Sequence, residues 1–113
     1  MRSTEKTEVY RNPYGAINTV IKFIDNATER IDGFVDHTRP LLINNIETLR
    51  MTFNDARRRG VKIRFVTEIT DDNITHCKEL MKSSVNELRH LDGIKGNFYV
   101  SEKEYVSPAT IHE

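Results

Sequence analysis

Hydrophobic and polar residues follow two periods along this chain, one typical of helices and one typical of strands. Residues 12–30 carry an apolar stripe at helical spacing, formed by Ile17, Val20, Ile21 and Ile24. Asn12 suits the cap of this helix and Pro13 its first turn. We therefore expect the first ordered element to be a helix, preceded by polar residues 1–8 that we expect to be loose.

Two further helices follow from the same period. The stronger one begins at Pro40, ends at residues 57–59, all arginine, and is followed by Gly60 as terminator. Its stripe steps by four, three, four and three residues and consists of Leu42, Ile46, Leu49, Phe53 and Ala56. The next helix has Asp71 or Asp72 as its cap and an apolar face formed by Ile74, Cys77, Leu80 and Met81.

The strand pattern is clearest in residues 61–66, where Val61, Ile63 and Phe65 alternate with basic residues. Residues 30–36 form a shorter strand candidate, with Ile31, Phe34 and Val35 expected to be buried. A strand of this kind directly after a helix suits a sheet covered on both faces. Residues 86–94 are compatible with either a helix extension or a short strand. Residues 96–108 predict a β-hairpin around a charged turn at 102–104, ended by Pro108.

The order of these elements predicts the α/β class, with a βαβ core, a mixed sheet, flanking helices and a C-terminal hairpin. Ligand sites in open α/β sheets lie beyond the carboxyl ends of the strands. Two polar segments occupy that edge: residues 36–39, Asp-His-Thr-Arg, and residues 67–71, Thr-Glu-Ile-Thr-Asp.

Composition narrows the class of protein. The 113 residues suit one domain, and 17 basic against 17 acidic residues give zero net charge, which argues against a nucleic-acid partner. A single cysteine excludes an intrachain disulfide framework. Without a membrane-spanning apolar run or a hydrophobic signal region, we expect a cytoplasmic domain with no membrane partner.

The segment at residues 36–39 supports two interpretations. Arg39 offers a guanidinium fork, His37 a group that titrates near neutral pH, and the following helix its free N–H groups, so together they suit an anionic ligand. Alternatively, Thr38 caps that helix, Pro40 begins it, and Arg39 pairs with Asp36 or Glu68. The structural interpretation is favoured slightly.

Other chemistry is weaker. Glu68, Asp71 and Asp72 have oxygens suited to a divalent metal, but helix capping explains the two aspartates equally well, so we expect no metal and no cofactor. Cys77 falls on an apolar stripe and is interpreted as a core residue. Zinc, nucleotide-loop and nucleophile-elbow motifs are absent. The charge runs at residues 5–8, 55–60 and 101–104 are interpreted as solvated faces.

The helix end and strand DARRRGVKIRFVTEIT resemble a block of the phospholipase D-like fold: a small residue, a glycine and an alternating strand. That family's catalytic HxKxxxxD motif would fall near Ile94, Gly96 and Ser101, and the required residue types are missing there. HCK at residues 76–78 has Ser83 in place of the aspartate, and HTR at 37–39 has arginine in place of the lysine. The resemblance therefore implies a phospholipase D-like half-domain without phosphodiesterase activity.

A second resemblance covers about residues 7–113. The segments HTRPLLI, RGVKIRFVTEIT, ELRHLDGIKGNF and SEKEYVSPATIHE together resemble the N-terminal sensor domain of archaeal, thaumarchaeal-type, signal-transduction histidine kinases. This resemblance implies that residues 1–113 belong to a single non-catalytic cytoplasmic input domain, which continues beyond residue 113. Its expected partners are kinase or other sensory modules of the same protein. The positions that match the sensor pattern are candidate ligand-binding residues: His37, Thr38, Arg39, Thr67, Glu68, Asn73, His90, Asp92 and Asn97.

Three hypotheses follow. The first is a sensor module of a two-component system that binds a small anionic ligand or relays a signal through dimer contacts. The second is a remnant of a phospholipase D-like phosphodiesterase. The third is a purely structural dimerisation module, because phospholipase D-like folds pair two halves and this chain has one. We expect a homodimer, and we expect no enzymatic activity because the kinase core motifs are also absent from the sequence.

Overall fold

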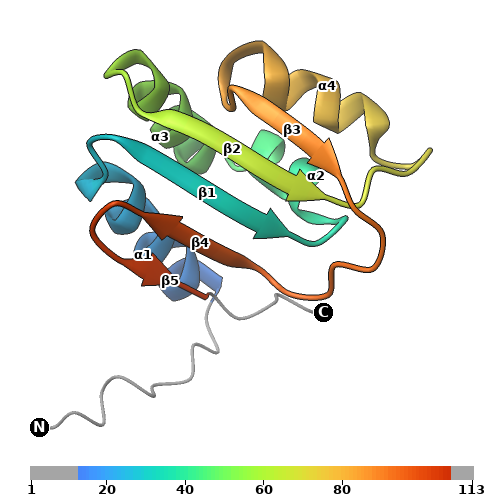
Figure 1. Cartoon of the computed structure of the whole chain (residues 1–113), viewed down its shortest axis with the longest axis horizontal. Helices are drawn as coiled ribbons and strands as arrows, with labels where there is room; N and C mark the ends of the chain where they lie inside the picture. Colours follow the sequence, from blue (N-terminus) through green and yellow to red (C-terminus); the bar gives the residue numbers. More distant parts are fainter. Residues whose placement is uncertain (1–12, 108–113) are drawn as a thin grey trace, which may run out of the picture.

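The strands form a single mixed sheet in the order β3-β2-β1-β4-β5 (Figure 1). The computed structural model of the protein describes residues 13–107, so Asn12, Pro108 and residues 1–8 lie outside it. Strands β1 (Arg30–Val35), β2 (Lys62–Thr67) and β3 (Glu87–His90) are parallel. Strands β4 (Phe98–Ser101) and β5 (Tyr105–Val106) form the antiparallel hairpin beside β1. The α/β class, the βαβ core and the C-terminal hairpin are confirmed, and residues 86–94 contribute a strand.

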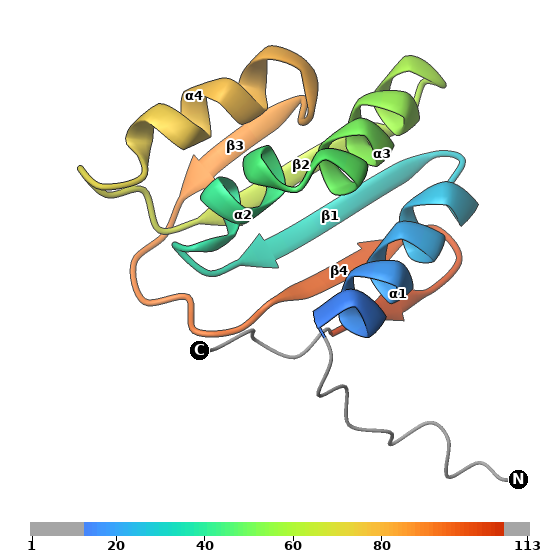
Figure 2. The same ribbon diagram turned by 180° about the vertical axis from the view of Figure 1, so that it is seen from behind.

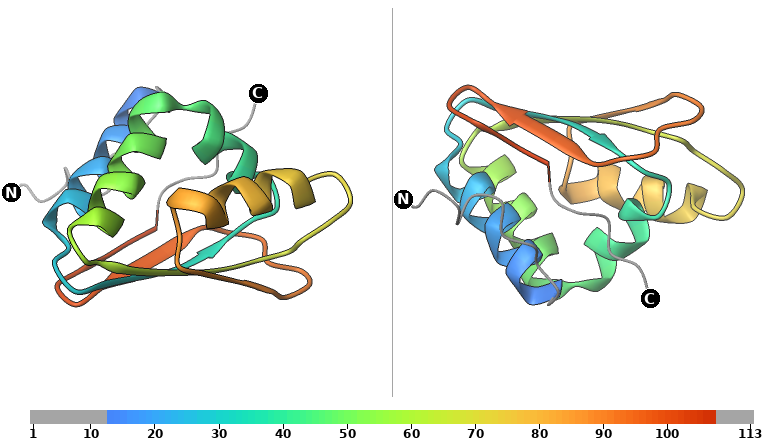
Figure 3. Two further views of the ribbon diagram at one scale, coloured as in Figure 1. Left: turned by 90° about the horizontal axis from the view of Figure 1, so that it is seen from above. Right: turned by 90° about the horizontal axis from the view of Figure 1, so that it is seen from below.

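All the helices of the described chain lie on one face of this sheet (Figures 2 and 3). They are α1 (Pro13–Asn26), α2 (Arg39–Asn45), α3 (Glu47–Arg58) and α4 (Ile74–Ser83). The connections from β1 to β2 and from β2 to β3 step in the same direction across the sheet, and right-handed crossovers in one direction place their helices on the same face. The prediction of a sheet covered on both faces is therefore wrong for the described residues. None of their helices is long and apolar enough to span a membrane.

The one-sided arrangement also changes which strand residues are buried. Ile31, Gly33 and Val35 face the helices, whereas Phe34 is 47% exposed on the opposite face. The prediction that Phe34 belongs to the core is wrong, because neighbouring strand residues point to opposite faces and only one face is covered here. On β2 the predicted alternation is confirmed: Ile63 and Phe65 are fully buried.

Aromatic rings in mutual contact form the centre of the core. Phe53 and Phe65 meet edge-to-face with centroids 5.5 Å apart, and Phe65 and Tyr99 lie 5.9 Å apart. Phe23 of α1 joins this cluster at 6.1 Å from Tyr99. The buried face of α1 is accordingly centred one position away from the predicted stripe and consists of Ala16, Val20, Phe23, Ile24 and Ala27.

The helix predicted after Pro40 is two helices. The chain becomes extended at Ile46, where φ is −96° and ψ is 105°, and α3 starts at the next residue. This break lets α2 pack against α4 while α3 packs against α1. The apolar residues keep their helical spacing across the break, so periodicity alone predicts a continuous helix.

Arg57 and Arg59, at the end of α3, are structural rather than merely solvated, whereas Arg58 between them is exposed. Arg57 donates hydrogen bonds to the carbonyls of Met81 and Val85, at 3.4 and 3.1 Å. Arg59 donates to the carbonyls of Ile24 and Ala27, at 3.3 and 3.0 Å. Both side chains satisfy backbone acceptors at the C-terminal ends of neighbouring helices, where a cation is favourable.

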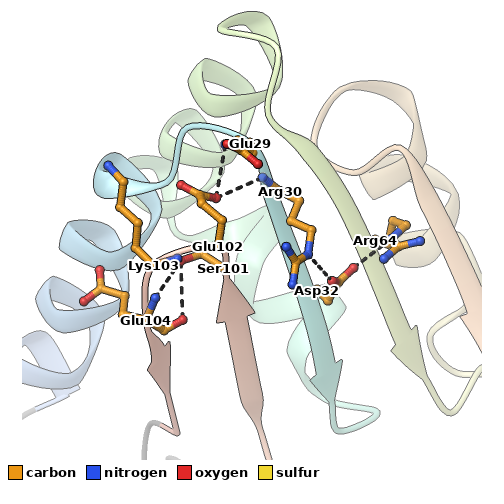
Figure 4. Close-up of polar contacts among 8 residues, drawn as sticks. All are labelled: Glu29, Arg30, Asp32, Arg64, Ser101, Glu102, Lys103 and Glu104. Carbon is orange, nitrogen blue, oxygen red and sulfur yellow. Dashed lines mark hydrogen bonds and ion pairs between the residues drawn. The ribbon is translucent and has the colours of Figure 1, made fainter.

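The charged turn of the β4–β5 hairpin also has a structural role, which corrects its interpretation as a solvated run (Figure 4). The Glu102 carboxylate accepts hydrogen bonds from the N–H groups of Thr28, Glu29 and Arg30 at 2.8, 3.1 and 3.1 Å. The Thr28 hydroxyl donates a fourth at 2.9 Å. Backbone hydrogen bonds, that of Thr28 first, hold the pKa of Glu102 far below the ordinary value of glutamate. The turn thereby fastens the hairpin to the loop before β1.

Candidate functional site

The two predicted polar segments lie together at the carboxyl ends of β1 and β2. The backbone carbonyl of Asp36 accepts a hydrogen bond from the Thr67 hydroxyl at 3.1 Å, so the ends of the two strands are joined directly. The approach to β4 lies at the same edge because β4 is antiparallel to β1, with Phe34 opposite Phe98. That geometry brings in Asn97, which precedes β4.

Asp36, Arg39 and Asn97 form the buried centre of this edge. The Asn97 Oδ1 atom accepts hydrogen bonds from the Asp36 N–H and from Arg39 Nε, both at 3.1 Å, and Asn97 Nδ2 donates to Asp36 Oδ2 at 3.0 Å. The three residues are only 7%, 5% and 3% exposed, respectively. One asparagine thus links the end of β1, the start of α2 and the start of β4. We call these three residues the edge triad.

Asp36 is held as a carboxylate. Burial pushes its pKa up, but hydrogen bonds from Thr38 and Asn97 and the nearby charge of Arg39 outweigh burial, so its pKa lies below the ordinary value of aspartate. Thr38 contributes both its N–H, at 2.9 Å, and its hydroxyl, at 2.6 Å, to Asp36 Oδ1. Thr38 therefore occupies the cap position of α2 without capping it, because its hydroxyl donates to Asp36 instead.

Most hydrogen-bond donors of the Arg39 side chain have no partner among the described residues. Its Nε atom bonds Asn97, whereas Nη1 and Nη2 make no hydrogen bond or ion pair with the described residues. The predicted ion pair of Arg39 with Asp36 or Glu68 does not form, although the Arg39 charge still acts on Asp36. A guanidinium group has five N–H donors, so four point to no described acceptor.

The Tyr99 hydroxyl is the second underused polar group near this centre. Tyr99 is 1% exposed, and its hydroxyl likewise has no hydrogen-bond partner among the described residues. Burial raises the pKa of Tyr99 to about 12, while the charge of Arg39 opposes this rise. The hydroxyl therefore stays protonated near neutral pH and lies within electrostatic reach of Arg39.

Asn73 connects the loops after β1 and β2. Its Nδ2 atom donates to the carbonyls of His37 and Glu68, both at 2.9 Å. Its Oδ1 atom accepts the N–H of Thr70 at 2.8 Å. Asn73, rather than the predicted Asp71 or Asp72, precedes the first residue of α4. Both aspartates are exposed, and the turn before α4 is closed by reciprocal hydrogen bonds between Thr70 and Asn73 instead.

A separate, exposed group lies beyond β3. His90 Nδ1 accepts the N–H of Ile69 at 3.0 Å, and its Nε2 lies 2.8 Å from Asp92. Glu68 Oε1 accepts the N–H of Gly93 at 3.2 Å. These contacts hold the loop after β3 against the loop after β2.

The structure thus divides the predicted site residues. Thr38, Arg39, Thr67 and Asn97 gather around Asp36, while Glu68 and His90 belong to the outer group and Asn73 bridges the loops. His37 is exposed, and its carbonyl rather than its imidazole makes the described hydrogen bond. The central role of Asp36 was missed. Its signal was the Asp-x-Thr spacing, which allows an aspartate to accept the N–H two residues ahead.

Metal and thiol chemistry find little support in the described residues. They contain no group of three or more histidine, cysteine, aspartate or glutamate side chains able to hold a metal ion. Cys77 is buried, as predicted, and burial raises the pKa of its thiol, so a reactive thiolate is disfavoured.

Comparisons of the chain with protein-family models, with curated proteins and with solved structures give no match. The phospholipase D-like and sensor-domain resemblances therefore remain predictions from the sequence.

Proposed function

We propose that this chain is a non-catalytic input domain of a signal-transduction histidine kinase, built on a phospholipase D-like half-domain, and that it binds a small anionic ligand through Arg39. The observation that carries the ligand proposal is the buried guanidinium group of Arg39, whose Nη1 and Nη2 atoms lack described partners. The signalling role rests on the sequence resemblance alone. The parallel β1–β2–β3 unit followed by an antiparallel hairpin supports the half-domain assignment.

The hydrogen bonding of the edge triad explains why an anion suits Arg39. A buried donor without a partner is costly, and guanidinium groups match carboxylates and phosphates in geometry. Asp36 is already engaged by Thr38 and Asn97 and does not form an ion pair with Arg39. We propose as donors to the oxyanion the Arg39 N–H groups that have no partner among the described residues, with the protonated Tyr99 hydroxyl within electrostatic reach of Arg39.

Thermal unfolding with inorganic phosphate or acetate, against chloride at equal ionic strength, tests this proposal. An anion that binds only the folded state stabilises it by about 1.4 kcal/mol at ten times its Kd. We expect a concentration-dependent rise in Tm for the wild type and none for Arg39→Met. Arg58→Met is the matched control, because Arg58 is exposed and paired with Asp55 on α3.

Two further variants allow for a failure of Arg39→Met to fold. Arg39→Lys keeps the charge but loses the fork, and Tyr99→Phe removes only a hydroxyl, so both are expected to weaken the phosphate response. A wild-type Tm that responds equally to chloride, phosphate and acetate would eliminate the anion site.

The signalling and enzymatic alternatives need separate measurements. A histidine kinase core encoded after residue 113 in the full reading frame would support the input-domain assignment, and its absence there would argue against it. We expect no hydrolysis of bis(p-nitrophenyl) phosphate. Measurable turnover that is lost in Arg39→Met would favour the phosphodiesterase alternative.

A further inference from the structure

The face of the sheet opposite the helices is uncovered by any described element (Figure 3). All-parallel sheets occur almost entirely with both faces covered, and β1, β2 and β3 form a parallel unit within this mixed sheet. We call the side chains that point away from the helices the bare face. A bare face on parallel strands suggests that something outside the described chain covers it.

The strand register arranges the bare face in rows that cross the sheet. One row runs from β3 to β5 and consists of Glu87, Arg64, Asp32, Val100 and Tyr105. The neighbouring row runs from β3 to β4 and consists of Arg89, Val66, Phe34 and Phe98. Each row changes from a charged side chain on β3 to apolar side chains toward the β4 edge; the first row becomes apolar at β4 and the second already at β2, two strands earlier.

The apolar half is large and exposed. Phe34, Phe98 and Tyr105 are 47%, 40% and 70% exposed, and the rings of Phe98 and Tyr105 lie 5.5 Å apart. Exposed aromatic side chains in a contiguous patch mark interaction surfaces more often than isolated ones do. Phe34, on the central strand β1, lies between this half and the charged half.

The charged half is predominantly basic. On β2 and β3 it presents Lys62, Arg64 and Arg89 against the single carboxylate of Glu87. Asp32 on β1 pairs with Arg64 at 2.7 Å and with Arg30 at 3.2 Å (Figure 4). Exposed pairs of this kind are weak and rearrange readily.

We propose that the bare face binds a second copy of this chain, related by a two-fold axis that lies in the interface and runs parallel to β1. Such an axis reverses the strand order, so β2 of one copy lies over β4 of the other, β3 lies over β5, and β1 lies over β1. The two sheets then form an aligned sandwich about 10 Å thick. The dimer proposal rests on the bare face alone and is independent of Arg39 and of the proposed anionic ligand.

The second row matches itself under this operation: Val66 of each copy lies over Phe98 of the other, and Phe34 meets its own counterpart at the axis. In the first row Arg64 lies over Val100, and the two Asp32 carboxylates that meet at the axis are each paired with Arg30 and Arg64 of their own copy. Arg64 and Arg89 thereby come beside the rings of Phe98 and Tyr105 of the other copy, on which a guanidinium group stacks favourably. Each contact is made twice, as expected for an isologous interface.

A single-stranded nucleic acid is the competing occupant, since exposed rings beside arginines also suit stacked bases. Two features disfavour it. The carboxylates of Asp32 and Glu87 interrupt the basic half, and the bare-face residues of β4 and β5 are uncharged. A polyanion therefore finds no continuous cationic track across the face, whereas a second copy buries the apolar row of Val66, Phe34 and Phe98 against the same row.

Sedimentation equilibrium of the 113-residue chain at micromolar concentrations tests the proposal. We expect a dimer for the wild type and a monomer for Phe34→Glu, which replaces the two apolar rings at the axis by carboxylates and adds them to the Asp32 carboxylates, already paired with arginines, that meet there. Met51→Glu is the matched control, because Met51 is 54% exposed on α3, on the helix side, and this variant is expected to stay dimeric. Far-UV circular dichroism of each variant checks that it is folded.

A second variant gives an independent readout. Arg89→Met removes a cation that is used twice in the dimer and is expected to raise the dimer Kd roughly tenfold, on the scale of two exposed cation–π contacts. A monomeric wild type, an undiminished dimer in Phe34→Glu, or an Arg89→Met dimer of unchanged Kd would overturn the proposal. Salt-dependent binding of a single-stranded oligonucleotide by a wild-type monomer would assign the face to the competing occupant.

Discussion

Gly33 lies on β1 beneath the aromatic rings of the core, where a side chain has no room. A Cβ atom built at this position lies 3.0 Å from Cδ1 and Cε1 of Phe65 and 3.0 Å from Cδ1 of Tyr99. Both rings are almost completely buried and touch each other, and Phe65 is also held by Phe53. Gly33→Ala therefore forces a displacement within the buried aromatic cluster of the core.

Two opposing terms set the size of the effect. Overpacking a core by a methyl group costs about 1–3 kcal/mol. Replacing glycine by alanine lowers the entropy of the unfolded chain and returns about 0.4–1 kcal/mol. We expect a net loss of about 1–2 kcal/mol in the free energy of unfolding of Gly33→Ala, which corresponds to a fall in Tm of roughly 5–10 °C for a domain of this size.

Gly96→Ala isolates the packing term. Gly96 has no atom within 4 Å of a built Cβ, and its φ is not positive, so only the entropic gain applies. Urea unfolding followed by far-UV circular dichroism gives the midpoints of both variants, and comparable m-values make them comparable free energies. If Gly33→Ala proves as stable as Gly96→Ala, the ring cluster is able to move aside and the packing argument is refuted.

Three other predictions concern buried or hydrogen-bonded groups. Glu102→Gln places amide donors against the N–H groups of the loop before β1 and lowers the Tm at pH 7, with Glu104→Gln as control. Folding lowers the pKa of Glu102, so its carboxylate stabilises the folded protein above the ordinary pKa of glutamate, and this stabilisation is lost as the pH falls toward the folded-state pKa. The difference in Tm between the wild type and Glu102→Gln should therefore shrink in acid, and a difference that stays constant with pH would contradict this. Folding raises the pKa of Tyr99 from 10.0 to about 12, so wild-type stability should fall between those pH values and fall less in Tyr99→Phe, as urea midpoints at each pH would show. The buried thiol of Cys77 should react with a thiol reagent such as dithionitrobenzoate far more slowly in the native protein than in urea, and equal rates would show that the thiol is accessible.

Local sequence patterns determined most elements of the fold, with β3 and the division into α2 and α3 as the exceptions. The alternation around Ile63 and Phe65 specifies β2, because the side-chain period of a strand is visible within a few residues. Gly60, with φ at +98°, ends α3 as expected, since glycine adopts this conformation readily. The order of helices and strands then predicts the parallel unit and places residues 36–39 at its carboxyl edge.

Contacts between distant residues could not be predicted in this way. Asn97 and Asp36 are 61 positions apart, and Glu102 and Thr28 are 74 apart, so no local period reveals either pair. The break at Ile46 follows from the need of α2 and α3 to pack against different helices. The spacing of the apolar residues across Ile46 is the same for one continuous helix and for two, so it does not reveal the break.

Which face of a strand is buried is also a tertiary property. The residues of β1 specify two faces, but the burial of Phe34 depends on whether a helix layer covers its side of the sheet. Right-handed crossovers in one direction place α2, α3 and α4 on the other side, which leaves Phe34 exposed. The sequence alone therefore determined β1, β2 and the β4–β5 hairpin and their order along the chain, and it left β3 open. Only the tertiary structure decided which face stays bare, because that depends on how distant segments pack.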